Sequence, residues 1–171
     1  RNFNLKNSYF FDKKILFFDG YFIQKWNYEQ INELFSQLKL RPISFNKEHI
    51  KICNKNVIIH ARGGDFLKIK NLNICDNYYY KKAIEYALRK GFNTFKVISE
   101  DRQYGEKIIK EMKKYFINLK ISILKSDSIK NDFNVIRSSN FAILSNSTFC
   151  WWASFLSNSK KEFLVPSNFS L

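Results

Sequence analysis

The chain has 171 residues, of which 45% are hydrophobic and 18% aromatic. This length and apolar content suit one substantial hydrophobic core with at most a small appendage, and they exclude a disordered chain. Lys and Arg outnumber Asp and Glu by 29 to 15, which gives a formal net charge of +14. Such an excess favours an anionic partner: nucleic acid, an acidic membrane surface or a phosphorylated small molecule. Because the lysines are scattered and form no dense basic arm, nucleic acid is not expected as a partner.

The cysteine content indicates the redox environment. Cys53, Cys75 and Cys150 are odd in number and too far apart for a disulfide framework or a CxxC metal clip. We therefore expect reduced thiols in a cytoplasmic protein. No apolar run approaches the length of a membrane span, and no signal-like segment opens the chain.

The amino-terminal part contains one expected strand and one expected helix. Ile15-Leu16-Phe17-Phe18 is an apolar run that stops at Asp19-Gly20, which predicts a strand. From Tyr28 to Pro42, apolar residues recur at helical spacing and predict an amphipathic helix. Residues 45–56 show no strong periodicity and are expected to be a connector.

From Val57 onward, strands and helices alternate. Asp76 is expected to cap the first helix of this region and Gly91 to end it. Repeated βα units of this length imply right-handed crossovers. The fold class is therefore α/β, with a Rossmann-like parallel sheet and helices on both faces. In chain order the sequence predicts a strand at 57–60, a helix at 77–90, a strand at 94–99, a helix at 106–116, a strand at 120–124, a helix at 132–138, a strand at 141–144, a helix at 149–156 and a strand at 163–165.

Residues 57–65, Val-Ile-Ile-His-Ala-Arg-Gly-Gly-Asp, read as a buried strand that breaks into a loop at its carboxyl end. Such strand ends bind ligands in α/β sheets. The planar, permanently charged Arg62 suits a phosphate, and Gly63-Gly64 permit close backbone approach. The alternative is that His60 is a satisfied core imidazole, Arg62 forms a surface ion pair with Asp65, and the glycines form an ordinary turn. The residues alone leave both readings open.

Two further strand ends carry acidic residues. Ser99-Glu100-Asp101 follows the strand at 94–99, and its carboxylates can accept hydrogen bonds from a ribose or an acceptor hydroxyl. For Glu100 we expect the plainer role of capping the next helix. Asp132 opens a helix, so it either caps that helix or faces the site.

The stretch from Leu144 to Ala153 passes from a strand through small polar residues into a helix. The hydroxyls of Ser147 and Thr148 and the free N–H groups of the helix amino end suit a phosphate. The alternative is an ordinary Ser or Thr cap, and we expect Trp151 and Trp152 to be core residues. No DxD pair or His/Cys cluster has metal-ligand spacing, so no metal is expected and positive charge must come from protein groups.

Four stretches taken together resemble glycosyltransferase family 11, the α-1,2-fucosyltransferases. His60–Asp65 resembles that family's HxRRGD motif, and Val97–Asp101 resembles its (F)SDD element. Asn146–Ala153 is similar to NSTFSWWGA, and Asp19–Gln24 is similar to the upstream GYFQ segment. The motifs occur in the family's order, which makes the resemblance specific.

The resemblance implies a GT-B-like donor domain of an inverting, metal-independent enzyme without a cofactor. Such an enzyme moves fucose from GDP-fucose to a galactose-type hydroxyl of an oligosaccharide or glycolipid. Arg62 and Asp65 would be catalytic: Arg62 stabilises the leaving diphosphate, and Asp65 either takes the acceptor proton or only orients Arg62. The implied donor-binding residues are His60 beside the nucleotide, Arg62 on the β-phosphate, Asp101 near the nucleotide, Asp132 on the guanine, and Ser147 and Thr148 on the pyrophosphate.

The sequence departs from the family pattern at three places. Gly63 replaces the second Arg of the first motif, Glu100 replaces the first Asp of the second, and the amino-terminal GxGNQ segment has no counterpart. Residues 1–50 are therefore expected to be a remnant of the acceptor lobe and residues 51–171 the donor-binding domain. The resemblance also implies surface-glycan synthesis at the cytoplasmic side of a membrane. An inactive or truncated GDP-sugar-binding module and a basic anion-binding module remain the alternatives.

Overall fold

A computed structural model of the chain describes residues 10–11, 15–16, 52–69, 75–125, 128–157 and 161–166. The chain divides into two compact units, Arg1–Leu40 and Arg41–Leu171. In the first unit, β1 (Phe10–Phe11) pairs antiparallel with β2 (Ile15–Leu16), so the described part of the strand expected at 15–18 is a strand. The helix expected at 28–42 lies outside the described residues. The assignment of residues 1–50 to an acceptor lobe and 51–171 to a donor domain stays a prediction.

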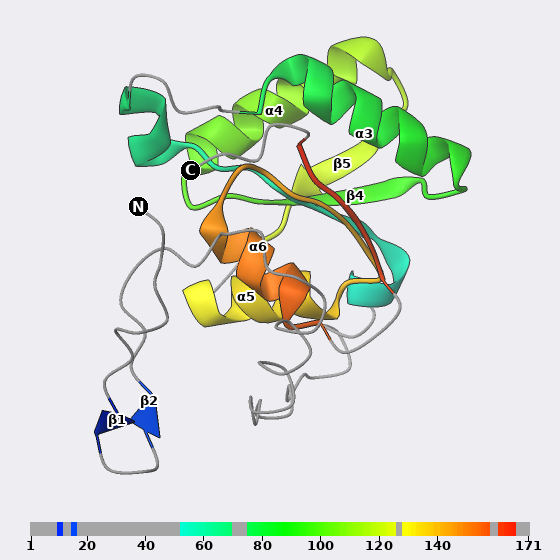
Figure 1. Ribbon diagram of the computed structural model, residues 1–171. Helices are drawn as coiled ribbons and strands as arrows, with labels where there is room; N and C mark the ends of the chain where they lie inside the picture. The colour runs from blue at the N-terminus through cyan, green and yellow to red at the C-terminus, as the bar shows by residue number, and fades with distance from the viewer. Residues whose placement is uncertain are drawn as a thin grey trace. The chain divides into compact units, whose positions relative to one another are not determined.

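The described residues of the second unit contain a five-stranded parallel sheet in the order β5-β4-β3-β6-β7 (Figure 1). Every one of these strands begins and ends within one residue of its predicted bounds. This agreement follows from the apolar runs, because strands buried on both faces of a parallel sheet are almost continuously hydrophobic. The strands are β3 (Val57–His60), β4 (Thr94–Ile98), β5 (Lys120–Ile123), β6 (Phe141–Ile143) and β7 (Glu162–Leu164).

Four α-helices alternate with these strands in the described part of this unit. They are α3 (Asn77–Arg89), α4 (Arg102–Tyr115), α5 (Ile129–Ser138) and α6 (Thr148–Phe155). Residues 52–55 add a helical turn before β3, where the sequence predicted only a connector. None of the helices in the described ranges is both long and apolar enough to cross a membrane.

The helices α4 and α5 begin four and three residues earlier than predicted, and the reason is the residue that caps each of them. The carboxylate of Asp101 accepts a hydrogen bond from Tyr104 N at the start of α4. The hydroxyl of Ser128 accepts one from Asn131 N at the start of α5. The expectation that Glu100 caps the helix after β4 is therefore wrong, and Asp132 lies inside the first turn of α5 and does not cap it.

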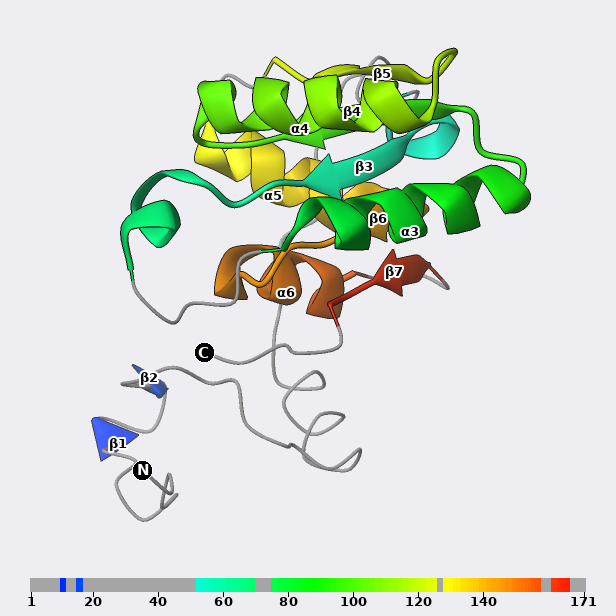
Figure 2. The same cartoon turned by 90° about the horizontal axis from the view of Figure 1, so that it is seen from above.

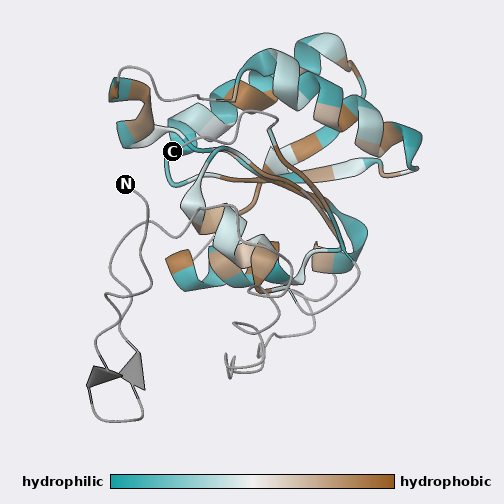
Figure 3. Ribbon diagram, viewed as in Figure 1, coloured by the Kyte–Doolittle hydropathy of each residue, from teal (hydrophilic) through white to brown (hydrophobic). Residues whose placement is uncertain are grey.

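The helices cover both faces of the sheet, as predicted. In Figures 1 and 2, α3 and α4 lie on one face, and α5 and α6 lie on the other. Alternate residues of β3 enter different cores, with Val57 and Ile59 facing α3 and α4, and Ile58 facing α5 and α6. Figure 3 shows the hydrophobic colour gathered on the strands between the two helical layers.

The strand order positions the site. From β3 the chain moves outward to β4 and β5, and then returns to place β6 on the other side of β3. The order reverses between β3 and β6, which is the topological switch point where open α/β sheets bind ligands. His60 ends β3, and the Ser145–Thr148 segment follows β6, so both predicted site segments lie at this point.

Candidate active site

His60 and Ser145 join the carboxyl ends of β3 and β6. His60 Nδ1 lies 2.7 Å from Ser145 Oγ, and the imidazole is buried. Burial, and to a smaller extent the charge of Arg62, lowers the pKa of His60 to about 3. The ring is therefore neutral at neutral pH and acts as a hydrogen-bonding group at the switch point. Its expected place beside a nucleotide stays a prediction.

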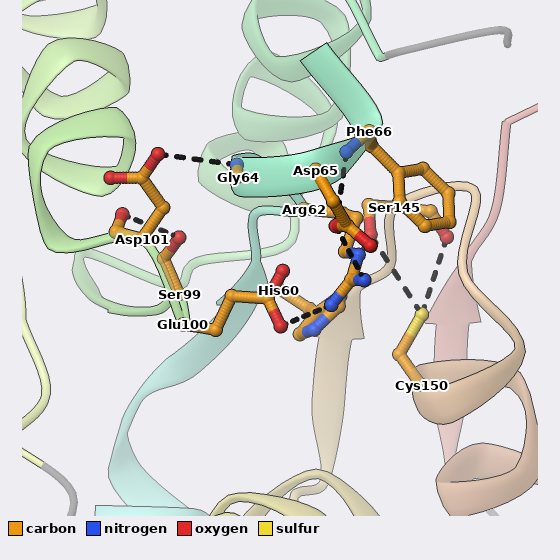
Figure 4. A network of polar contacts seen from close by, with 10 residues as sticks. All are labelled: His60, Arg62, Gly64, Asp65, Phe66, Ser99, Glu100, Asp101, Ser145 and Cys150. Carbon is orange, nitrogen blue, oxygen red and sulfur yellow. Dashed lines mark hydrogen bonds and ion pairs between the residues drawn. The ribbon is translucent and has the colours of Figure 1, made fainter. Parts of the chain in front are cut away.

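Arg62 is held by two carboxylates and one aromatic ring (Figure 4). Its Nη2 donates to Asp65 Oδ1 over 2.8 Å, and its Nη1 forms an ion pair with Glu100. The guanidinium carbon lies 4.4 Å from the centre of the Phe66 ring, within cation–π range. The ion pair with Asp65 is the one that the plainer reading of the sequence anticipated, whereas Glu100 and Phe66 are additional.

Strand register explains why Glu100 reaches Arg62. β3 and β4 are parallel neighbours with His60 opposite Ile98. Continuing that register by two residues places Arg62 opposite Glu100. A charged pair at facing positions of adjacent strand ends is thus a consequence of how β3 and β4 pair.

Gly64 and Asp101 fix the loop that follows Arg62. Gly64 has a φ of 61°, in the left-handed region that favours glycine, and its N–H donates to Asp101 Oδ2 over 3.1 Å. Since Asp101 Oδ1 also accepts from Tyr104 N, one carboxylate joins the loop to the amino end of α4. This is the residue that the resemblance places near the nucleotide.

Gly63 is confined by Tyr104. A Cβ added at Gly63 would lie 2.6 Å from Tyr104 Cγ and 2.7 Å from its Cβ, far inside van der Waals contact. Tyr104 is buried, so it has little room to move. The position that carries a second Arg in the family motif therefore has no space for any side chain in this chain.

The amino end of α6 forms the other side of the candidate site. Ser145, Asn146 and Ser147 are buried, and Thr148 is half-buried. Ser147 is the N-cap residue, yet its side chain makes no capping hydrogen bond, contrary to the ordinary cap that was the alternative reading. The first N–H groups of a helix have no partner within that helix, so this end can donate to an anion.

Cys150, in the first turn of α6, contacts the backbone of the segment that precedes this helix. Its Sγ lies 3.2 Å from the carbonyl oxygens of both Ser145 and Ser147. The side chain is fully buried, and burial raises the pKa of the thiol to about 12. The group is therefore a neutral thiol, whose single proton is shared between the two carbonyl oxygens.

Asp132 reaches the same edge of the sheet from a different element. It lies in the first turn of α5, which follows the carboxyl end of β5. Its neighbour Phe133 contacts Phe149 in the first turn of α6, with ring centroids 5.5 Å apart. The structure thus joins His60 to Ser145 and joins Arg62 to its acidic neighbours, while Asp132 approaches from the side of α5.

The two tryptophans were wrongly expected to be core residues. Trp151 and Trp152 are only half-buried, and neither belongs to the two buried clusters. They contact each other and Phe155, which stacks on Trp151 with centroids 4.7 Å apart. The reason is that Cys150 and Ala153 form the buried side of α6, which leaves Trp151 and Trp152 on the rest of its circumference.

Sequence reasoning missed Tyr79 and the pairing of Glu100. The Tyr79 hydroxyl lies 2.5 Å from Leu144 O and 3.1 Å from Leu164 O, so it ties the ends of β6 and β7 together. Nothing in the local pattern marks Tyr79, because tyrosine in a helix is usually a packing residue.

The described residues contain no group of three or more His, Cys, Asp or Glu side chains that could hold a metal ion.

The described part of the second unit therefore has a Rossmann-like α/β fold of the GT-B kind, with polar strand ends at its topological switch point. The family model for glycosyl transferase family 11 matches residues 8–170. The chain therefore belongs to glycosyl transferase family 11, as the four motifs indicated.

Two comparisons with individual proteins accompany that match. An α-1,2-colitosyltransferase from Escherichia coli is 25% identical over 146 residues, which are 82% of this chain and 49% of that protein. A crystal structure of POFUT1 in complex with GDP-fucose superposes with a TM-score of 0.51 at 12% identity, over 81% of this chain and 45% of that one. The second likeness supports the fold. The chain spans about half the length of the relatives it matches.

Proposed function

We propose that this chain is the donor-binding part of a metal-independent, inverting fucosyltransferase that takes fucose from GDP-fucose. The acceptor is a galactose-type hydroxyl of an oligosaccharide or glycolipid. One observation carries the proposal: in a family 11 chain, Arg62 and the amino end of α6 flank the switch point between β3 and β6. The names of the two similar proteins, a colitosyltransferase and a protein crystallised with GDP-fucose, support this choice of chemistry.

The chemistry required is stabilisation of the leaving diphosphate. As the bond from fucose to GDP breaks, negative charge develops on the β-phosphate. Arg62 supplies a permanent positive charge with planar donors, and the first N–H groups of α6 supply further donors. Ser147 and Thr148 stand at that helix end, where their hydroxyls would contact the pyrophosphate. Asp132 would bind the guanine, His60 would lie beside the nucleotide, and no cofactor is needed.

Asp65 is the proposed general base, with orientation of Arg62 as the competing role. Its carboxylate is largely exposed, accepts from Arg62 Nη2 and also accepts from Phe66 N over 3.0 Å. The two roles differ in kinetics. If Asp65 is the base, Asp65→Asn lowers kcat without weakening GDP binding. If Asp65 only orients Arg62, the same variant weakens GDP binding.

Calorimetric titration without metal tests the donor site. GDP and GDP-fucose are titrated into the chain, with UDP and ADP as controls for base recognition. We expect selective binding of the guanine nucleotides that falls about 10- to 100-fold in Arg62→Ala, because a hydrogen-bonded charge is lost. The matched control is Arg102→Ala, since Arg102 is exposed and pairs with Glu106 on the surface of α4. A folded chain that binds no guanine nucleotide contradicts the proposal.

A second candidate function is a GDP-sugar-binding module without transfer activity. The observation that favours it is Gly63, which replaces the second Arg of the family motif and has no room for a side chain, so the site has one positive charge fewer to stabilise a leaving diphosphate. Transfer of labelled fucose to a galactose-terminated acceptor separates the two functions, and GDP binding without transfer would identify the module.

A basic anion-binding module is the remaining alternative. It predicts binding to a polyanion that salt weakens steeply and that GDP does not compete away. Peripheral association with the cytoplasmic face of a membrane belongs to the main proposal, and vesicle co-sedimentation tests it.

A further inference from the structure

Glu100 lies where an anion would meet Arg62. Its Oε2 is ion-paired with Arg62 Nη1, while its Oε1 faces Gly64, where an added Cβ would lie only 3.3 Å away. Figure 4 shows this carboxylate extending toward the guanidinium from the end of β4. The guanidinium and the glycine backbone are the two groups that the sequence predicted to suit a phosphate, so Glu100 occupies the position expected for an anion.

The remaining donors of Arg62 are also constrained. Nη2 is taken by Asp65, the Phe66 ring covers one face, and Nε is buried without a hydrogen-bond partner among the described residues. The single positive charge of Arg62 therefore faces the two carboxylates of Asp65 and Glu100, so these three side chains together carry a net charge of −1. An incoming diphosphate would meet like charge unless one carboxylate moves away.

Glu100 is the carboxylate that can leave. Its side chain is 48% exposed, and Arg62 is its only polar partner among the contacts of the described residues. Asp65, by contrast, is also held by Phe66 N. Because the Glu100 carboxylate is half-exposed, solvent screens its attraction to Arg62 and can solvate it after release, so releasing Glu100 costs little.

We propose that Glu100 competes with the diphosphate of the donor for Arg62 and thereby sets donor affinity. This inference rests on the proposed function, since it takes the ligand to be a diphosphate. Glu100 acts through Arg62 and through charge repulsion, and it is not a catalytic group. The exchange is an ion-pair replacement in which no covalent bond changes.

The test is titration of Glu100→Gln with GDP and with inorganic pyrophosphate. Glutamine keeps the size of the side chain and removes its charge, so we expect both ligands to bind about fivefold more tightly than to the unchanged chain. Glu106→Gln is the matched control, because it makes the same change in net charge at an exposed ion pair on α4. Glu100→Asp, which keeps the charge on a shorter side chain, should bind with intermediate affinity.

The outcomes separate this inference from the proposed function. If Glu100→Gln binds GDP selectively but no more tightly than the unchanged chain, the competition is refuted and the donor site stands. Weaker binding to Glu100→Gln would mean that Glu100 holds Arg62 in its binding position, and it also refutes the competition. If pyrophosphate binding tightens while GDP binds no better than pyrophosphate, the competition stands and the guanine site fails. If neither probe binds any folded variant, both proposals fail.

Discussion

His60 Nδ1 and Ser145 Oγ lie 2.7 Å apart and connect the ends of two strands that are distant in sequence. The contact spans the point where the strand order reverses. Because burial and the nearby charge of Arg62 keep His60 neutral, this contact is a neutral hydrogen bond. It fixes the spacing between the Arg62 loop and the amino end of α6.

The depressed pKa of His60 makes stability depend on pH. The pKa is about 3 in the folded chain against an ordinary value of 6.5, so between these values the unfolded chain binds more protons. Stability is then lost as the pH falls below about 6.5. Between pH 7 and pH 5 we expect His60 to account for a loss of about 2 kcal/mol. Urea unfolding at several pH values measures this loss.

His60→Gln is the control for that prediction. Glutamine can still hydrogen-bond Ser145 but does not titrate, so the loss of stability from pH 7 to pH 5 should shrink by about 2 kcal/mol. His49 is present in both chains and cancels in the comparison. Equal pH dependence in the two chains would show that His60 is not held neutral.

Gly63→Ala should destabilise the chain by about 1–3 kcal/mol, the usual cost of overpacking a filled site. The added methyl group meets Tyr104 Cβ and Cγ, which lie near the backbone and cannot swing away. Tyr104→Ala opens that space, so the double variant should lose less than the sum of the single losses. Thermal or urea unfolding of all four chains measures the coupling.

Gly91→Ala is the matched control for that cycle. Gly91 has a φ of 90° and no atom within 4 Å of an added Cβ, so alanine there strains only the backbone. Its loss should add to that of Tyr104→Ala without coupling. Additive losses for Gly63→Ala as well would refute the predicted clash.

Asp101→Ala and Asp76→Ala should each cost about 1 kcal/mol, because each carboxylate caps a helix. They should differ in ligand binding. Asp101 also accepts a hydrogen bond from Gly64 N, so its removal frees the loop after Arg62 and weakens GDP binding. Asp76 accepts a hydrogen bond from Tyr79 N at the start of α3, so its removal should leave GDP binding unchanged. Calorimetric titration of both variants is the measurement. Equal GDP affinity in the two would mean that the loop does not depend on Asp101.

The three cysteines should resist thiol reagents in the folded chain. All three are buried, and burial raises the pKa of Cys53 and Cys75 to about 11 and that of Cys150 to about 12. Since the thiolate is the reactive form, a colorimetric thiol assay at pH 8 should find almost no reaction until denaturant is added. Rapid reaction of one thiol in the folded chain would contradict the burial of that residue.

The sequence by itself determined the elements that local pattern encodes. Apolar runs predicted β3 to β7 within one residue, and their alternation with amphipathic segments predicted a parallel sheet covered on both faces. It also predicted that Arg62 and the segment before α6 follow the ends of buried strands, because a charged or polar break after a buried strand is visible in the order of residues. These features depend on neighbours in the chain.

Tertiary structure alone decided which groups meet. Asp101 caps α4 in place of Glu100, because a cap depends on backbone dihedral angles at one residue. Glu100 instead reaches Arg62, because the register of β3 against β4 places the two opposite each other. Register and helix packing arise from contacts between residues far apart in the chain, and the local pattern along the sequence does not specify those contacts.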